Sequence, residues 1–278
     1  MFELIKKHQS DTRFGLLCIF IASCVSILPI AILGIPAGTD LQQHLQFAAA
    51  YHNAILSGDF FPGWSANENY GFGSVGIRFY PPIPYYLLAF TQFLTGNWYE
   101  SYWLNVFFWT FLGCVGIYFW VKDSFSAKSA IAAAVHYAFM TNHLFQIYQA
   151  GLFAEFAASG ILPFCFFFAF RLIKHGTTIY ILLFSISFSV LILMHIPLTI
   201  IGSISLGIYI LSLMNRGNFR RILINFLTAF GLTASATAFY WLRFITEIDW
   251  VKHSSSQYSS GYAGFQIYLF PTFYSMGK

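Results

Sequence analysis

Long apolar segments alternate with short polar ones along most of this chain. The first 13 residues are polar, and uninterrupted apolar segments follow at 14–35, 101–121, 129–145, 153–170 and 222–245. A further apolar segment, 178–215, is too long for one membrane crossing and is interrupted by Met194-His195-Ile196-Pro197, so we predict a hairpin of two helices there. The pattern predicts an all-α integral membrane protein with about seven transmembrane helices.

The composition agrees with a membrane protein. Hydrophobic residues make up 58% of the chain and charged residues only 9%, with 34 Phe and 17 Tyr, far from the balance of a soluble domain. The net charge of +4 is accounted for by short loops, and without a basic patch nucleic-acid binding is excluded. The four cysteines lie inside apolar segments without paired spacing, so we predict neither disulfides nor a zinc site.

The segment 81–96 decides the topology. It is apolar, but it is short for a crossing and begins with Pro-Pro-Ile-Pro. If it does not cross, most lysines and arginines fall on one side, as the positive-inside rule expects. We therefore predict an interfacial helix here and a multi-pass protein of the inner (plasma) membrane with a cytoplasmic N-terminus.

This topology divides the chain into three parts. Residues 1–13 form the cytoplasmic N-terminus, 14–245 a polytopic transmembrane domain with a first outer loop at 36–100, and 246–278 an outer-face tail. The tail has too little apolar length to span the membrane or to form a core. We expect it to be truncated, with this chain the front part of a longer protein.

The first outer loop carries the most suggestive chemistry. Residues 40–56 have the pattern of an amphipathic helix, on which Asp40 and His44, four residues apart, share a face at the membrane surface. Further along, Arg78 stands beside the aromatic and proline-rich sequence Tyr80-Pro81-Pro82, which could hold a lipid-linked anionic group. The predicted topology also brings Glu155, His143 and His195 to this outer face.

Each of these residues also has a purely structural interpretation. Asp40 with His44 could cap and solubilise an interfacial helix, and Arg78 could reach phospholipid headgroups. His195 could mark a helix turn, and His143 could form an interhelical hydrogen bond. Glu155 favours function, because an acid near the bilayer interior is costly without a purpose.

The order of these motifs resembles a known family. Asp40-x-x-x-His44, Trp64, Gly71-x-Gly73, Tyr80-Pro81-Pro82 and Tyr85-Tyr86, followed by Glu155 and His195-x-Pro197, are similar to the bacterial membrane proteins labelled "6-pyruvoyl-tetrahydropterin synthase-related". The label is historical and implies no pterin chemistry. The resemblance covers roughly 14–197, and the family in turn resembles the GT-C glycosyltransferases of the cell envelope, which use polyprenyl-phosphate sugars.

The resemblance implies a layout and roles for individual residues. It implies a GT-C-like fold in which Asp40 is the general base, His44 orients it or contacts substrate, and Glu155 lines the same cavity. Arg78 and Tyr80 would stabilise the departing phosphate. The catalytic candidates are thus Asp40, His44 and Glu155, and the substrate-binding candidates are Trp64, Arg78, Tyr80, Tyr85, His143 and His195.

The same resemblance bears on cofactors and partners. Many GT-C enzymes carry two adjacent acids in the first loop, whereas Leu41 follows Asp40 here, which argues against a divalent metal. We predict no cofactor. The expected partners are a polyprenyl-phosphate-linked sugar and membrane lipid, and the sequence does not identify which proteins this one binds.

Three classes of function remain open at this point. The favoured one is a membrane glycosyltransferase that takes a sugar from a polyprenyl-phosphate donor at the outer face. A transporter of a lipid-linked substrate is the second; no predicted span carries a mid-membrane charge and no inverted repeat is visible. The third is a catalytically silent membrane scaffold.

Overall fold

The computed structural model describes residues 2–247 and 249, and within that part of the chain it contains helices and no strand. The all-α prediction is therefore confirmed there. Most of the predicted tail, 246–278, lies outside the described residues. Residues up to Tyr240 form one compact unit, and a second unit begins at Trp241; the description below concerns the first.

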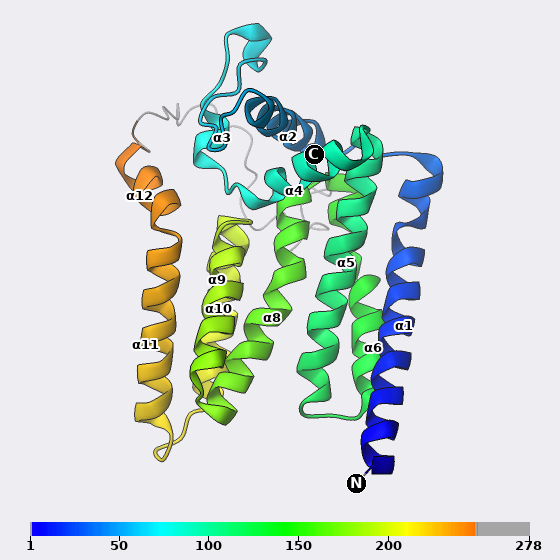
Figure 1. Ribbon diagram of the computed structural model, residues 1–278, viewed down its shortest axis with the longest axis vertical. Helices are drawn as coiled ribbons and strands as arrows, with labels where there is room; N and C mark the ends of the chain where they lie inside the picture. Colours follow the sequence, from blue (N-terminus) through cyan, green and yellow to red (C-terminus); the bar gives the residue numbers. More distant parts are fainter. Residues whose placement is uncertain (1, 248, 250–278) are drawn as a thin grey trace, which may run out of the picture. The chain divides into compact units, whose positions relative to one another are not determined.

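Seven longer helices carry most of the apolar sequence. They are α1 (Phe2–Leu33), α5 (Trp98–Lys122), α6 (Ala127–Ala138), α8 (Phe153–His175), α9 (Thr178–Ile192), α10 (Ile196–Ser212) and α11 (Phe219–Ala236). These helices run side by side, up and down (Figure 1). By length and hydropathy, α1, α5 and α8 qualify as membrane spans, and α11 with the following α12 (Ala238–Glu247) qualifies as a fourth if the bent pair is one span. The protein is thus a membrane protein with several apolar helices.

Helix α5 lies at the centre of the packing, against α1, α4, α6 and α8. Its contact with α8 is close because small residues meet there. A Cβ atom added at Gly160 would lie 2.7 Å from the carbonyl oxygen of Trp109, and one at Gly113 would lie 3.2 Å from the Cα of Gly160. Small residues at such crossings let two apolar helices approach closely, which favours their association in a lipid environment.

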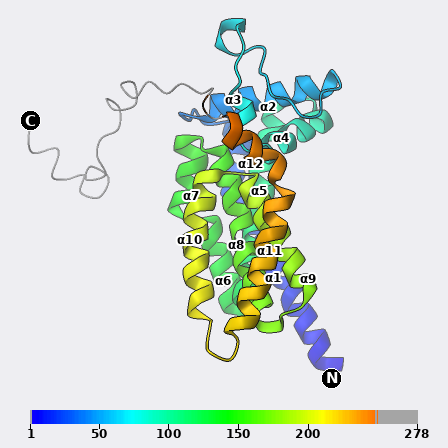
Figure 2. The same ribbon diagram turned by 90° about the vertical axis from the view of Figure 1, so that its left-hand side faces the viewer.

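Four further helices lie in the segment between α1 and α5. They are α2 (Leu41–Leu56), the short η1 (Asn69–Gly71) and α3 (Gly76–Phe79), and α4 (Ile83–Thr95). Helices α2 and α4 lie across one end of the bundle instead of along it (Figures 1 and 2). The predicted amphipathic helix at 40–56 is confirmed, and the segment 81–96 forms a short helix on the bundle end.

The hairpin predicted within 178–215 is also confirmed. Helix α9 ends at Ile192 and α10 begins at Ile196. His195 is the N-cap of α10, and its Nδ1 accepts a hydrogen bond from the Leu198 amide at 3.3 Å. Pro197 fits the first turn of α10, where a missing N–H leaves no helical hydrogen bond unmade.

One expected helix is broken. The sequence predicts a single span over 129–145, but α6 ends at Ala138. After a break come the five-residue α7 (Thr141–Phe145) and a turn of π-helix, η2 (Gln146–Ala150). The physical reason is a competing hydrogen bond: the ring of His143 contacts the carbonyl oxygen of Tyr137 at 2.8 Å. That oxygen would otherwise accept the Thr141 amide in a continuous helix.

Candidate functional site

Close backbone packing holds the start of α2 on the bundle end. A Cβ atom at Gly38 would lie 2.6 Å from the Cα of Gly151, so only two glycines allow this approach. Gly151 also has a φ of +69°, in the left-handed region that favours glycine. The hydroxyl of Thr39 and the amide of Asp40 both donate to the carbonyl oxygen of Ala150, at 2.9 and 3.2 Å. These contacts fix Asp40 beside the start of α8.

His44 is the polar residue on the buried face of α2. Its side chain is 5% exposed, and its Nδ1 is hydrogen-bonded to the Tyr85 hydroxyl of α4 at 2.8 Å. Its ring also packs near the rings of Tyr80 and Phe153, with centroids 5.9 and 6.3 Å away. Burial lowers the pKa of His44 to about 4, a shift that the Asp40 carboxylate opposes and His195 reinforces. The imidazole is therefore neutral at pH 7.

Glu155 approaches the same place from α8. It lies in the first turn of that helix, where the helix dipole favours a negative charge. The buried Gln146 donates a hydrogen bond from Nε2 to Glu155 Oε1 at 2.8 Å. This amide fixes the orientation of the carboxylate, while the Gln146 Oε1 is buried without a hydrogen-bond partner.

His195 joins the group from the turn between α9 and α10. Burial lowers its pKa, and the nearby Glu155 carboxylate opposes the shift. Asp40 and His195 thus act electrostatically on His44, and Glu155 acts on His195, although three separate parts of the sequence supply these residues. We call these four residues the acid–histidine cluster.

Two tyrosines complete the surroundings of the cluster. Burial raises the pKa of Tyr80, and the carboxylates of Asp40 and Glu155 raise it further, which places its hydroxyl within electrostatic range of both acids. Tyr85 is fully buried, and its pKa is raised well above the ordinary value, mainly by burial. Because its hydroxyl is engaged by His44, Tyr85 is placed to position the histidine.

Three of the predicted site residues lie apart from the contacts that define the cluster. His143 is buried against the rings of Tyr137 and Phe156, with centroids 4.3 and 5.9 Å away. Trp64 packs against Gly73 in the loop beyond α2. Arg78 lies against Gly63 of the same loop, so that a Cβ atom there would be 2.7 Å from Nη1.

The cluster has no arrangement typical of a metal site. Among residues 2–247 and 249, no group of three or more His, Cys, Asp and Glu side chains is placed to hold a metal ion. What the arrangement offers instead is an exposed carboxylate at Asp40, a half-buried one at Glu155, and histidines whose pKa values are lowered. Neutral imidazoles and ionised carboxylates are groups that accept protons.

Sequence reasoning missed the residues that assemble the cluster. Gln146 lies just beyond the apolar segment 129–145 and carries no motif, and Gly38 and Gly151 are far apart in the chain. The one available signal was the position of each glycine beside a predicted helix boundary, which is compatible with many turns. Only the folded chain shows that the two glycines face one another.

Comparison with known proteins assigns the chain to a family. A search of curated proteins finds no match. Residues 77–276 match the family described as 6-pyruvoyl-tetrahydropterin synthase related domain, a membrane protein. The matched region includes Tyr80, Glu155 and His195 but begins after Asp40 and His44. The match covers well over half of the sequence, and the chain belongs to this family of membrane proteins.

Proposed function

We propose that this protein is a glycosyltransferase with a GT-C-like layout that transfers a sugar from a polyprenyl-phosphate donor at the outer face of the inner membrane. The observation that carries the proposal is the acid–histidine cluster: two carboxylates and two histidines converge at one end of a bundle whose composition is otherwise strongly apolar. Ionisable groups in such a setting are costly, so they favour a functional site over a structural one.

The proposed layout has seven crossings, with α2 and α4 lying in the outer interface. Helices α6, α9 and α10 are shorter than a typical span, at 12, 15 and 17 residues, and a thinned bilayer or flanking residues would accommodate them. Basic residues lie where α5 and α8 end and where α11 begins, away from α2, among them Lys122, Arg171 and Arg220. By the positive-inside rule this end is cytoplasmic, and the N-terminus of α1 shares that side.

In the proposed reaction Asp40 acts as the general base. The acceptor hydroxyl gives its proton to Asp40 as its oxygen attacks the anomeric carbon of the sugar, and the bond from that carbon to the phosphate oxygen breaks. The electron pair leaves with polyprenyl phosphate. Tyr80 would donate a hydrogen bond to the departing phosphate. Arg78, which lies outside the cluster but two residues before Tyr80 in the chain, would reach the same phosphate through charge-assisted hydrogen bonds. Glu155 and His195 would face the sugar from the opposite side of the cluster.

A structural role is the competing function, and one observation favours it. His44 is buried and paired with Tyr85, as a histidine that merely holds α2 on α4 would be. In that case the protein would be a scaffold, and the cluster would serve only to hold the helices of the first outer loop in place.

The test is a donor assay with the full chain in proteoliposomes. A polyprenyl-phosphate-linked sugar is supplied, and the release of polyprenyl phosphate is measured. Arg78→Ala is expected to weaken donor binding and turnover together, because a phosphate contact is made in both the ground and the transition state. Arg220→Ala, at the other end of the bundle, is the matched control and should change neither. Release no faster than from protein-free liposomes would favour the scaffold.

A further inference from the structure

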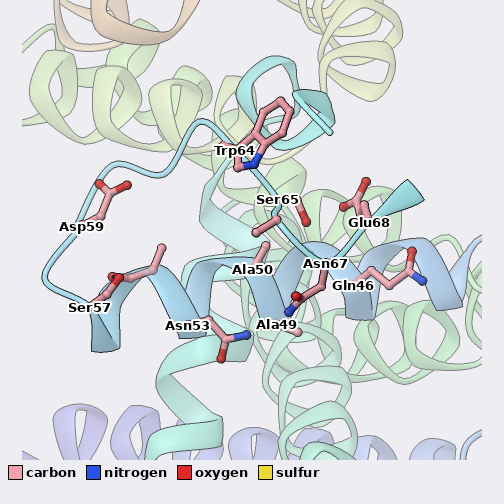
Figure 3. A pocket seen from close by; sticks show the side chains of 12 residues that line it. Gln46, Ala49, Ala50, Asn53, Ser57, Asp59, Trp64, Ser65, Asn67 and Glu68 are labelled. Atoms are coloured by element: carbon pink, nitrogen blue, oxygen red, sulfur yellow. The ribbon is translucent and has the colours of Figure 1, made fainter. Parts of the chain in front are cut away.

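A second site lies in the first outer loop, apart from the acid–histidine cluster. The chain beyond α2 returns along that helix and leaves a cavity of about 370 Å³ between them (Figure 3). This volume falls within the range of about 300–1,000 Å³ that is common for small-molecule sites. One wall is α2 from Gln46 onward, with Asn53 and the C-cap residue Ser57. The other wall is the loop, with Asp59, Trp64, Ser65, Asn67 and Glu68.

The loop wall is held in place by several contacts. Ser65 and Ser74 pair their backbones in a short antiparallel bridge, with hydrogen bonds of 2.8 and 2.9 Å. The Tyr86 hydroxyl of α4 donates to the carbonyl oxygen of Phe60. The Asp59 carboxylate accepts the Phe61 amide at 3.0 Å. The cavity is therefore bounded by a regular helix on one side and by a loop held by hydrogen bonds on the other.

The Trp64 ring packs against Gly73 and is otherwise largely exposed. A Cβ atom at Gly73 would lie 2.1 Å from Trp64 Cζ2, and Gly73 has a φ of +81°, so glycine is required there on both grounds. The indole packs against Gly73 on one side, yet 54% of its surface remains exposed. A large amphipathic ring supported from behind is suited to pack against the C–H face of a sugar ring while its N–H stays available as a donor.

The polar lining matches hydroxyl groups. Amide side chains supply both donors and acceptors, and carboxylates accept two hydrogen bonds at each oxygen. The lining contains Gln46, Asn53 and Asn67 as amides and Asp59 and Glu68 as acids. Moreover, Glu68 Oε1 is buried without a hydrogen-bond partner among the described residues, which leaves the Glu68 carboxylate only partly satisfied by the protein.

The charge of the lining selects among sugars. Among the described residues that line this cavity there is no lysine or arginine, whereas Asp59 and Glu68 supply two carboxylates. A phosphorylated or acidic sugar would be repelled, and an amino group would be attracted. We propose that this loop cavity binds a sugar without anionic groups, with a preference for an amino sugar, stacked on Trp64 and hydrogen-bonded by Glu68. Its role as the site of an acceptor sugar rests on the proposed function, but the binding itself does not.

The experiment measures binding to the full chain in nanodiscs by saturation-transfer NMR, with three probes that share one ring: glucose, glucosamine and glucose 6-phosphate. Glucosamine should bind more tightly than glucose, and glucose 6-phosphate should not bind. Trp64→Ala should weaken both binding probes by about tenfold, as expected for losing a stacking surface. Glu68→Gln should remove the preference for glucosamine while leaving glucose bound.

The controls separate this proposal from the transferase. Phe72→Ala removes another exposed ring of the same loop that does not line the cavity, and it should leave all three titrations unchanged. Asp40→Asn should leave sugar binding unchanged as well. If the unsubstituted protein bound glucosamine but released no polyprenyl phosphate from the donor, that result would overturn only the transferase. Equal binding of glucosamine to Trp64→Ala and to the unsubstituted protein, or tight binding of glucose 6-phosphate, would overturn the sugar site.

Discussion

His44 of α2 and Tyr85 of α4 are joined by a buried hydrogen bond of 2.8 Å between Nδ1 and the tyrosine hydroxyl. The bond connects the two helices that lie across the bundle end, and both side chains are at most 5% exposed. It fixes which way the imidazole faces, and with it the surroundings of Asp40. Helices α2 and α4 are therefore joined by a polar contact as well as by the packing of the Tyr85 ring against the rings of Phe47 and Tyr51.

Removing the Tyr85 hydroxyl should destabilise the protein. Tyr85→Phe leaves the buried His44 nitrogen without its partner, which costs about 1–3 kcal/mol of the free energy of unfolding. The measurement is thermal or denaturant unfolding in detergent micelles. Tyr70→Phe is the matched control, because the Tyr70 side chain is fully exposed, and it should leave unfolding unchanged. Equal stability of Tyr85→Phe and the unsubstituted protein would mean that this hydrogen bond does not contribute to the free energy of unfolding.

The buried His44 predicts a pH dependence with a defined sign. Its pKa is about 4 in the folded protein and near 6.5 when unfolded. Below pH 6.5 the unfolded chain gains a proton that the folded chain does not bind, so this contribution to stability is complete above pH 6.5 and is lost as the pH falls towards 4. Nitrogen NMR of labelled histidine should find His44 neutral at pH 5.5. A titration midpoint near 6.5 would show that the ring is not buried as described.

The contact between Gly38 and Gly151 should tolerate no side chain. Gly38→Ala places a Cβ atom 2.6 Å from the Gly151 Cα, and overpacking of this kind costs about 1–3 kcal/mol. Because the shift displaces Asp40, donor turnover should fall together with unfolding stability. Gly231→Ala in α11 meets no atom within 4 Å, and it should be neutral or stabilising by up to about 1 kcal/mol. If both variants behaved alike, the close approach of the two segments would be disproved.

The proposed topology is tested by labelling single cysteines with an impermeant thiol reagent in intact cells. The four native cysteines are first replaced. Asn67→Cys, in the loop beyond α2, should then label from outside, whereas Ser124→Cys, between α5 and α6, should label only after the membrane is opened. Labelling of Ser124→Cys from outside would show that α4 crosses the membrane and that the seven-crossing layout is wrong.

The sequence was sufficient for the helices whose ends carry local signals. The hairpin at His195 and Pro197 and the amphipathic α2 were predictable because helix caps, proline and periodicity act within a few residues. The break after Ala138 was not, because it depends on the His143 ring reaching the Tyr137 carbonyl oxygen. No glycine or proline marks that position.

The candidate site was predictable only in part. Asp40 and His44 could be placed together from their spacing, and Glu155 from its rarity in an apolar segment. Their meeting with His195, and the contacts of Tyr85 and Gln146, depend on the packing of α2, α4 and α8. Trp64 was grouped with the same site, whereas it lines the separate loop cavity. Contacts between segments that are distant in the sequence produce no periodic pattern of residues, so a single sequence does not predict them.

The central claim is that Asp40 is the base of a sugar-transfer reaction, and Asp40→Asn tests it most directly. The amide preserves size and hydrogen bonding but accepts no proton, so turnover of the polyprenyl-phosphate-linked sugar should fall by about 10²–10⁴, while the donor remains bound. Glu100→Gln, which neutralises an exposed acid in the first turn of α5, should retain full turnover. Unchanged turnover in Asp40→Asn would contradict the account and leave the cluster with a structural role.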